Sequence, residues 1–227
     1  MTNIDISLLQ LFNGSNSPFL DQWAMTLTST WTWSLFFLML FYLVLKNNEK
    51  PAQIGLIIMA CALCMLFSAG MVELIAKPLT ARLRPSHDPS LMSVVDLVKG
   101  YQALGYSFFS GHSSNTMSLA VFLALVVRHY RFTIYMILWS LLNAWSRLYL
   151  GVHYPSDVAI GLLWGICVGL VVYLIYMYCY NKTISKLHFI SVQYTKTGYS
   201  LTDMNIVCCS LVITLLYTIC RAMIFAH

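Results

Sequence analysis

The feature that most constrains this chain is a series of long apolar runs separated by short polar segments. Hydrophobic residues make up 59% of the sequence and charged residues only 9%, whereas a soluble domain carries about 25% charged residues. Runs of this length cross the roughly 30 Å of a bilayer core as helices, because a helix satisfies its own backbone hydrogen bonds. The sequence therefore predicts an all-α, polytopic membrane protein.

We expect six membrane-spanning helices in one compact bundle, so that residues 1–227 form a single domain. The expected spans are Trp23–Leu45, Gln53–Ala76, His112–Val127, Phe132–Tyr149, Ser156–Tyr180 and Met204–Phe225. The third and fourth are short for a bilayer, so we expect their ends to lie in water or in a polar cavity. Ahead of them, Ile4–Phe12 is predicted to be a short amphipathic segment on the membrane surface, followed by a turn.

The basic residues of the loops predict the orientation. With six spans, the first, third and fifth loops share one face, which carries Lys46, Lys50, Arg128, Arg131, Lys182, Lys186 and Lys196. The opposite face, with both termini, carries Lys77, Arg82, Arg84, Lys99, Arg147 and Arg221. Lys77, Arg84 and Arg147 belong to the site proposed below, and without these three the positive-inside rule places the first face in the cytoplasm. Both termini then lie outside.

Three polar clusters interrupt the apolar sequence. They are Lys77-Pro-Leu-Thr-Ala-Arg82-Leu-Arg84-Pro85, then Ser110-Gly111-His112, then Ser146-Arg147 followed by His153 and Asp157. All three lie at ends of expected spans that share the outer face. Charged groups are costly in a membrane and usually mark function. We therefore expect the clusters to surround one pocket at the membrane surface.

The residue types in these clusters suit the binding of a tetrahedral oxyanion. Lys77, Arg84 and Arg147 can neutralise the non-bridging oxygens of a phosphate, with arginine offering bidentate geometry. Ser110 and Gly111 precede a helix, where backbone N–H groups and the positive end of the helix dipole favour an anion. The sequence thus predicts a phosphate cradle.

The remaining residues suit phosphoryl transfer. With two histidines, one can attack phosphorus while the other protonates the departing alkoxide. Asp157 lies four residues beyond His153 and can accept the far N–H of its imidazole. The pattern of His112, His153 and Asp157 therefore predicts a two-step transfer through histidine.

Each residue also has a simple structural explanation when it is taken alone. Lys77 can be an interfacial anchor, Arg147 or His153 an ordinary interface residue, and Asp157 a first-turn acid favoured by the helix dipole. Their joint spacing favours a site instead. Arg82 stays open between a structural contact and a contact with phosphate or lipid headgroups.

Three further features carry less signal. Glu73 lies one helical turn before Lys77, so the two can form an ion pair. The loop 86–105 can cover the pocket, but its titratable residues have no motif partner. Cys61 and Cys64 have a redox or metal spacing, yet they lie within a span and we interpret them as packing residues.

The three clusters resemble the signature of the type 2 phosphatidic acid phosphatase superfamily: Lys77-x6-Arg84-Pro85, Ser110-Gly111-His112 and Ser146-Arg147-x5-His153-x3-Asp157. That family includes bacterial phosphatases of phosphatidylglycerophosphate, undecaprenyl pyrophosphate and lipid A, glucose-6-phosphatase, and soluble vanadium haloperoxidases. The match covers about a third of the chain, and six spans are typical of the membrane branch. Phe109 departs from the family pattern, which commonly has proline there.

The resemblance implies a role for each residue. His153 becomes the nucleophile that forms a phosphohistidine, Asp157 its orienting partner and His112 the general acid. The phosphate cradle comprises Lys77, Arg84, Ser110, Gly111 and Arg147. The resemblance also implies a reaction without metal or cofactor.

The sequence therefore predicts an integral-membrane phosphatase that acts on an amphiphilic phospholipid, lipid A or a polyprenyl (pyro)phosphate. We expect it in a bacterial inner membrane with its site facing the periplasm or exterior, and without a nucleic acid or an obligate protein partner. Two alternatives stay open. One is a membrane phosphotransferase with the same phosphohistidine step. The other is a non-catalytic lipid-phosphate binding or transport protein, which would need no nucleophile or acid.

Overall fold

The computed structural model describes residues 3–91, 93–183 and 192–226; Lys186, used above in the count of loop charges, lies outside them. In these residues every regular element is a helix, apart from an isolated bridge between Tyr194 and Ser200. The helices of more than three residues, besides those introduced below, are α1 (Asn3–Phe12), α6 (Gly111–Val127), α7 (Tyr130–Tyr149), α8 (Pro155–Thr183) and α9 (Leu201–Ile224). The predicted all-α fold is confirmed.

The first expected span, Trp23–Leu45, is wrong as a single helix. Helix α2 (Pro18–Thr28) ends at Ser29, and the short helix η1 (Thr30–Trp33) then leads into α3 (Ser34–Asn47) at a bend of 72°. Two side-chain hydrogen bonds stabilise the bend. The Thr32 hydroxyl donates to the Thr26 carbonyl, and the Trp33 indole N–H donates to the Leu27 carbonyl. These bonds satisfy carbonyls that a continuing helix would have used, so the break costs little.

Helix length and hydropathy support part of the predicted membrane topology. In the described residues, Pro51–Thr80, Pro155–Lys182 and Leu201–Ile224 are long and apolar enough to cross a bilayer, and the bent pair α2–α3 would be a fourth span. Helix α6 is apolar but has only 17 residues. The chain is thus a helical integral-membrane protein with three or four clear candidate spans among these residues, and the expected number of six is not established.

The helical stretch Pro51–Thr80 is not uniform. It consists of α4 (Pro51–Gly70), a π-helical turn, η2 (Met71–Ala76), and the short α5 (Lys77–Thr80). In the π-turn the Lys77 N–H bonds to the carbonyl of Val72, five residues back. Pro78 explains this widening, because it has no N–H to donate and its ring clashes with a regular preceding turn. The π-turn therefore affects the direction in which the Lys77 side chain projects from the helix.

Helices α6 and α8 pack closely enough for their backbones to touch. A Cβ atom built on Gly161, Gly165 or Gly169 of α8 would lie 2.6–2.8 Å from a carbonyl oxygen of α6. The three carbonyls belong to Ser110, Ser114 and Ser118, whose side chains are fully buried. Small residues that recur every fourth position allow this approach in membrane helices. The contact fixes the start of α6 against the start of α8.

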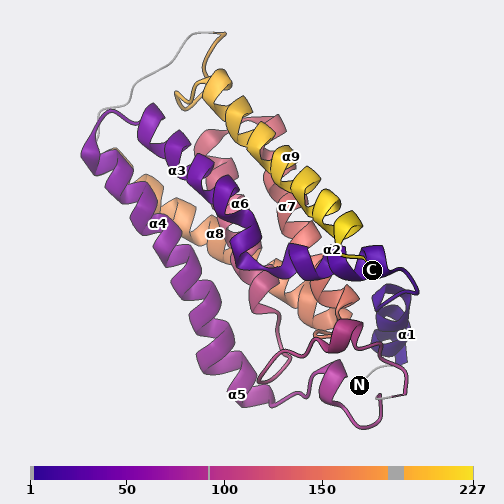
Figure 1. The fold of residues 1–227 in the computed structure, drawn as a ribbon. Helices are drawn as coiled ribbons and strands as arrows, with labels where there is room; N and C mark the ends of the chain where they lie inside the picture. Colours follow the sequence, from indigo (N-terminus) through magenta and orange to yellow (C-terminus); the bar gives the residue numbers. More distant parts are fainter. Residues whose placement is uncertain (1–2, 92, 184–191, 227) are drawn as a thin grey trace.

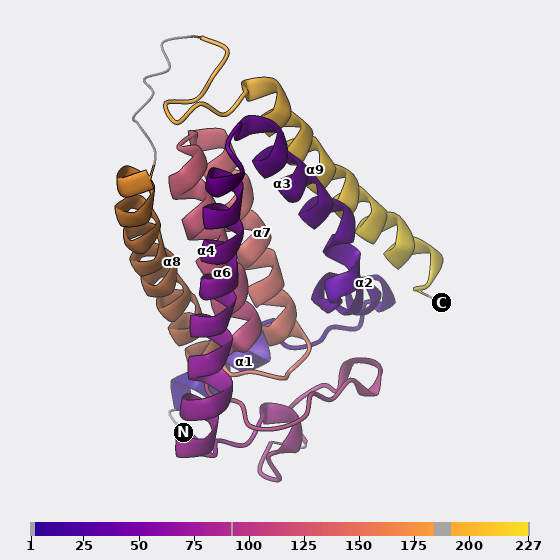
Figure 2. The same ribbon diagram turned by 90° about the vertical axis from the view of Figure 1, so that its left-hand side faces the viewer.

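The N-terminal helix and the long connection between α5 and α6 lie together at one end of the bundle (Figures 1 and 2). The connection contains the short helices η3 (Pro85–His87) and η4 (Val98–Gly100). As expected, Asn3–Phe12 is a helix followed by a turn: it exposes Ile4 and Leu11 and buries Leu9 against Leu91, Val95 and Tyr154. The end of α7 and the starts of α6 and α8 meet the connection here, so the sequence clusters share one end of the fold.

Candidate active site

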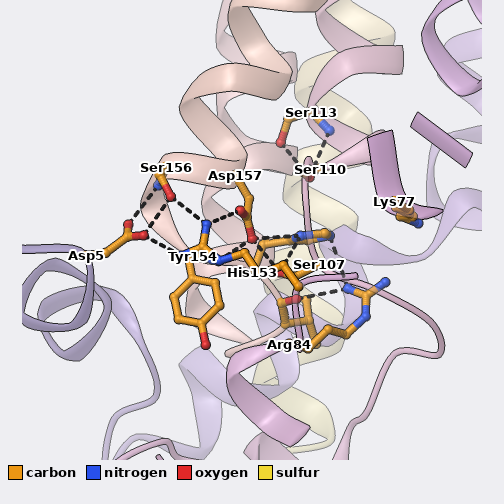
Figure 3. Close-up of polar contacts among 12 residues, drawn as sticks. Asp5, Lys77, Arg84, Ser107, Ser110, Ser113, His153, Tyr154, Ser156 and Asp157 are labelled. Carbon is orange, nitrogen blue, oxygen red and sulfur yellow. Dashed lines mark hydrogen bonds and ion pairs between the residues drawn. The ribbon is translucent and has the colours of Figure 1, made fainter. Parts of the chain in front are cut away.

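His153 lies in the loop between α7 and α8, buried between two polar partners (Figure 3). Its Nε2 atom lies 3.2 Å from Nη1 of Arg84, and its Nδ1 atom lies 3.7 Å from Oδ2 of Asp157. Because a guanidinium only donates, Nε2 is the acceptor, and the proton of the neutral ring is on Nδ1. Burial, reinforced by nearby Arg147 and Arg84 against the opposing effect of Asp157, lowers the pKa of His153 to about 4. The ring is therefore neutral at pH 7.

Asp157 is fully buried in the first turn of α8, where several donors hold its carboxylate. Oδ1 accepts from Nη1 of Arg82 at 2.6 Å, and Oδ2 accepts from the Tyr154 N–H at 3.1 Å and from the Ser107 hydroxyl. The Ser107 oxygen also lies 3.5 Å from Nδ1 of His153. The expected pair of His153 and Asp157 is therefore present as neighbours, and Ser107 contacts both.

Arg84 and Arg147 approach the histidines from different elements. Arg84 precedes η3 and donates from Nη1 to the Val152 carbonyl, from Nη2 to the Leu104 carbonyl and from Nε to the Gly105 carbonyl, at 2.9–3.0 Å. Burial is the main reason that its pKa falls to about 10, so it keeps its charge at neutral pH. Arg84 thus both supplies charge beside His153 and joins two loops.

Arg147 comes from the last turn of α7 and is buried. Its Nη1 donates to the hydroxyl of Thr28, at the end of α2, and lies 3.3 Å from the hydroxyl of Tyr101. Its Nε is buried without a hydrogen-bond partner among the described residues. Arg147 is therefore placed by the bend after α2 and keeps one donor for another ligand.

Lys77 forms the ion pair with Glu73 that the i, i+4 spacing predicts, with 2.5 Å between Nζ and Oε1. A Cβ atom on Gly111 would lie 3.7 Å from that same Glu73 oxygen. The pair therefore lies beside the start of α6, and Lys77, Arg84 and Arg147 are all within electrostatic reach of His112. The expected cations converge on the two histidines.

The start of α6 differs in one detail from the expected cradle. The Ser110 N–H donates to the backbone carbonyl of Asp157 at 3.1 Å, and the Ser110 hydroxyl caps the helix by accepting from the Ser113 N–H. Ser110 thus joins α6 to α8 with its backbone. The next two N–H groups, of Gly111 and His112, belong to the first turn, where a helix provides no acceptor. They are the backbone donors that remain for an anion.

His112 is exposed at the start of α6 and borders a cavity of about 170 Å³. Residues of α2, η1, α3, α4, α6 and α7 line this cavity, among them Thr28, Met65 and Asn143. A group held here would lie against the imidazole of His112. The two histidines thus differ in environment: His153 is buried and fixed, and His112 faces open space.

Two residues of this network carry no signature in the sequence. Ser107 contacts Asp157 and His153, and Asp5 of α1 accepts from Nη2 of Arg82 at 2.6 Å. Arg82 thereby bridges Asp5 and Asp157, which favours the structural one of the two roles left open for it. One signal was available for Asp5. It shares the buried face of α1 with Leu9, one turn later, and a carboxylate on a buried face implies a partner.

Asp5 forms a second contact with α8. The Ser156 N–H donates to its Oδ1 at 3.0 Å, and the Ser156 hydroxyl donates to its Oδ2 at 2.6 Å. Burial raises the pKa of Asp5, but the hydrogen bonds from Ser156 and Arg82 outweigh it, and the net pKa is lowered. An ion pair with Arg82 and hydrogen bonds from Ser156 therefore link helix α1 to the turn that carries Asp157.

Comparison with known proteins identifies the family. The family model described as the PAP2 superfamily matches residues 58–181, more than half of the chain and including all three clusters. The chain belongs to the PAP2 superfamily. PAP2 relatives include a lipid A 4'-phosphatase of Bacteroides thetaiotaomicron, 34% identical over 166 residues that cover 73% of each chain. A lipid A 4'-phosphatase of Porphyromonas gingivalis is 34% identical over 186 residues, which cover 79% of this chain and 75% of the relative.

A solved structure shows the same PAP2 fold. The crystal structure of Aquifex aeolicus LpxE matches with a TM-score of 0.59 and 23% identity, covering 75% of this chain and 95% of that one. Together with the relatives, the family membership makes this protein a phosphatase, a hydrolase of phosphomonoesters. It is a membrane lipid phosphatase of the PAP2 type.

Proposed function

We propose that this PAP2 phosphatase removes a phosphate from a lipid A-type glycolipid through a phosphohistidine on His153. The substrate class is supported by the two relatives with 34% identity, both lipid A 4'-phosphatases. The observation that carries the mechanism is the setting of His153, which is buried and neutral, with Nε2 directed at Arg84 and Nδ1 at Asp157 and Ser107. A nucleophile needs such an unprotonated nitrogen beside a phosphate-binding cation, and the Nε2 lone pair leaves Arg84 when it attacks phosphorus.

In the first step Nε2 of His153 attacks phosphorus, and the bond from phosphorus to the leaving oxygen breaks. The negative charge of the bound phosphate offsets the nearby cations, and His112, protonated in that complex, gives its proton to the departing alkoxide, so that an alcohol leaves. Asp157 stabilises the positive charge that develops on His153. In the second step water attacks phosphorus, His112 takes the proton from that water, and the bond to Nε2 breaks to release inorganic phosphate.

The cations are assigned to the phosphate itself. Arg84 and Arg147 are buried and reach the histidines from different elements, and Lys77 lies beside the start of α6. Charged donors in a site that excludes water stabilise the trigonal-bipyramidal transition state strongly. The N–H groups of Gly111 and His112 complete the cradle, and Ser110 serves it by fixing the start of α6.

The location follows from the loop charges. We place six spans in a bacterial inner membrane, with Lys46, Arg128 and Lys182 on the cytoplasmic side and the active site on the periplasmic or outer side. Helix α1 then lies in the outer interface, with Ile4 and Leu11 exposed toward lipid. Cysteine labelling of a loop on each face by an impermeant reagent in intact cells tests this orientation.

The deciding experiment measures phosphate release by the purified protein from lipid A, phosphatidylglycerophosphate, undecaprenyl pyrophosphate and phosphatidic acid. We expect lipid A to give the highest kcat/KM, and His153→Ala to reduce release by at least about a thousand-fold, as loss of a nucleophile does. His87→Ala, in the η3 turn outside the network, is the matched control. Release that persists in His153→Ala contradicts the nucleophile, and preference for another lipid contradicts the substrate class.

A further inference from the structure

The cavity beside His112 continues into a second cavity deeper in the bundle. The second has a volume of about 230 Å³, and apart from the indole N–H of Trp139, the thiol of Cys61 and the thioether of Met136 its lining side chains are aliphatic or aromatic hydrocarbon. Phe37, Leu119 and Trp139 line both cavities. The two are therefore neighbouring parts of one groove, which begins at a candidate catalytic residue.

The residue numbers give the direction of this groove. Along α6 its lining moves from His112 to Leu123, and along α4 it moves from Met65 back to Ile57. Because these two helices run in opposite directions, both changes lead away from the end that carries the active site. The groove thus runs along the helices, from the surface of the membrane toward its middle.

The groove is open on one side. Phe41 of α3 and Ile58 of α4 line it and are nearly half exposed, whereas Ile57 and Trp139 at its base are buried. Phe41 and Ile58 lie within the expected first and second spans, so the opening faces the acyl region of a bilayer. A chain can therefore enter from the membrane sideways between α3 and α4.

Polar atoms are concentrated in the part next to His112. The Trp139 indole N–H and the Asn115 side-chain carbonyl are buried and have no hydrogen-bond partner among the described residues. Both residues line the cavity beside His112. Buried donors and acceptors are usually paired, so an unpaired donor beside an unpaired acceptor indicates a ligand with both kinds of group.

We propose that this groove binds the leaving-group half of the lipid substrate. One acyl chain lies in the apolar part between α3, α4, α6 and α7, and the hydroxyl- or amide-bearing part of the leaving alcohol lies against Trp139 and Asn115. This assignment rests on the proposed function, because His112 protonates the leaving oxygen and the leaving group must therefore lie on its side. The occupant is the substrate itself, since the groove ends at the atom that reacts with it.

The first test fills the apolar part. Cys61 lines it and is small, so Cys61→Phe places a ring where the acyl chain would lie. We expect kcat/KM for lipid A to fall at least about ten-fold, as occurs when a hydrophobic pocket loses room, with p-nitrophenyl phosphate, which has no tail, hydrolysed as by the parent protein. The matched control is Cys167→Phe on α8, an exposed position outside the groove. Equal loss on both substrates, or in both variants, overturns the proposal.

The second test separates a ligand contact from a structural role. In Asn115→Leu a buried carbonyl without a partner is replaced by a side chain of similar size, which should leave the melting temperature unchanged or raise it. We expect the same variant to lose lipid A turnover several-fold and to retain p-nitrophenyl phosphate hydrolysis. A fall in melting temperature together with unchanged lipid turnover contradicts the ligand contact.

A third measurement does not depend on turnover. Phosphatidic acid with a photoreactive diazirine in its acyl chain is cross-linked to the His153→Ala protein, and the labelled peptides are mapped by mass spectrometry. We expect label within 37–65 and 119–139, and less of it after Cys61→Phe is added. Label elsewhere overturns the groove even if the protein is a phosphatase. Label at the groove in a protein without phosphatase activity overturns the proposed function alone.

Discussion

Helix α8 contacts α6 along glycines and serines with their backbones in contact, whereas α3 faces α4 and α6 across an open groove. The first region carries Asp157 and Ser110 at adjacent helix starts, joined by a backbone hydrogen bond. The second region borders His112 through Thr28, Thr30 and Trp33, which belong to the bend. The contrast teaches that close helix packing supports the proposed nucleophile, while the bend between α2 and α3 leaves space for the proposed leaving group.

The chemistry explains why the two regions differ. A nucleophile must keep its geometry within a fraction of an ångström through two steps, so its supports must not move. A lipid must enter from the bilayer and its alcohol must depart, which requires an opening at membrane depth. Close packing serves the first need, and the 72° bend between α2 and α3 serves the second.

The largest effect on stability is expected at the ion pairs that Arg82 forms with Asp5 and Asp157. Arg82→Gln removes the cation that bridges Asp5 and Asp157, and it leaves a fully buried carboxylate without its counter-charge. We expect the free energy of unfolding to fall by about 3–5 kcal/mol, measured by denaturation in detergent. Arg131→Gln, at an exposed position on α7, is the control and should change it little. Equal losses of unfolding free energy in the two variants would mean that Arg82 does not stabilise the contact between α1 and α8.

A smaller loss of stability is expected from a substitution within the α6–α8 contact. In Gly165→Ala the new methyl group would lie 2.6 Å from the Ser114 carbonyl, so the helices must separate. We expect a loss of about 1–3 kcal/mol and a lower melting temperature. Gly55→Ala in α4 meets no atom within 4 Å and should stabilise its helix by a few tenths of a kcal/mol. A melting temperature that moves in the same direction in both variants would contradict close packing as the support of Asp157.

The smallest effect on stability is expected from a substitution at the bend between α2 and α3. Thr32→Val removes the hydroxyl that donates to the Thr26 carbonyl, and we expect a loss of about 1 kcal/mol. Hydrolysis of lipid A should fall more than that of p-nitrophenyl phosphate, because the bend borders the groove. Thr214→Val removes a hydroxyl bonded to a carbonyl within α9 and should leave the ratio of the two activities unchanged. An unchanged ratio of the two activities in Thr32→Val would mean that the bend does not affect the proposed leaving-group site.

The sequence located most of the candidate site because catalytic side chains occur in compact motifs. Lys77, Arg84, His112, Arg147 and His153 were each named from spacing, and the structure brings them together around the same point. Ser110 was expected to bind phosphate with its N–H, but this group is bonded to the backbone of Asp157. A sequence shows that a donor exists, and only the fold shows which acceptor has already taken it.

The supporting residues escaped the sequence for a related reason. Asp5 is 77 residues from Arg82 and 151 from Ser156, and Ser107 is 50 from Asp157. Contacts over such separations leave no periodic pattern in a single chain. The serine and glycine repeat of α6 and α8 was available as a small-residue pattern at four-residue spacing, and it would have predicted their contact.

The sequence by itself determined the membrane class, the family and the residue types of the candidate site, because hydropathy, charge and short motifs are local properties. Tertiary structure alone decided that the first apolar run is bent rather than straight, since that depends on side chains that satisfy carbonyls six residues away. It also decided that a cavity borders His112 and adjoins an apolar cavity between α3, α4, α6 and α7. A cavity is the space left between four helices, and no single segment of the chain encodes it.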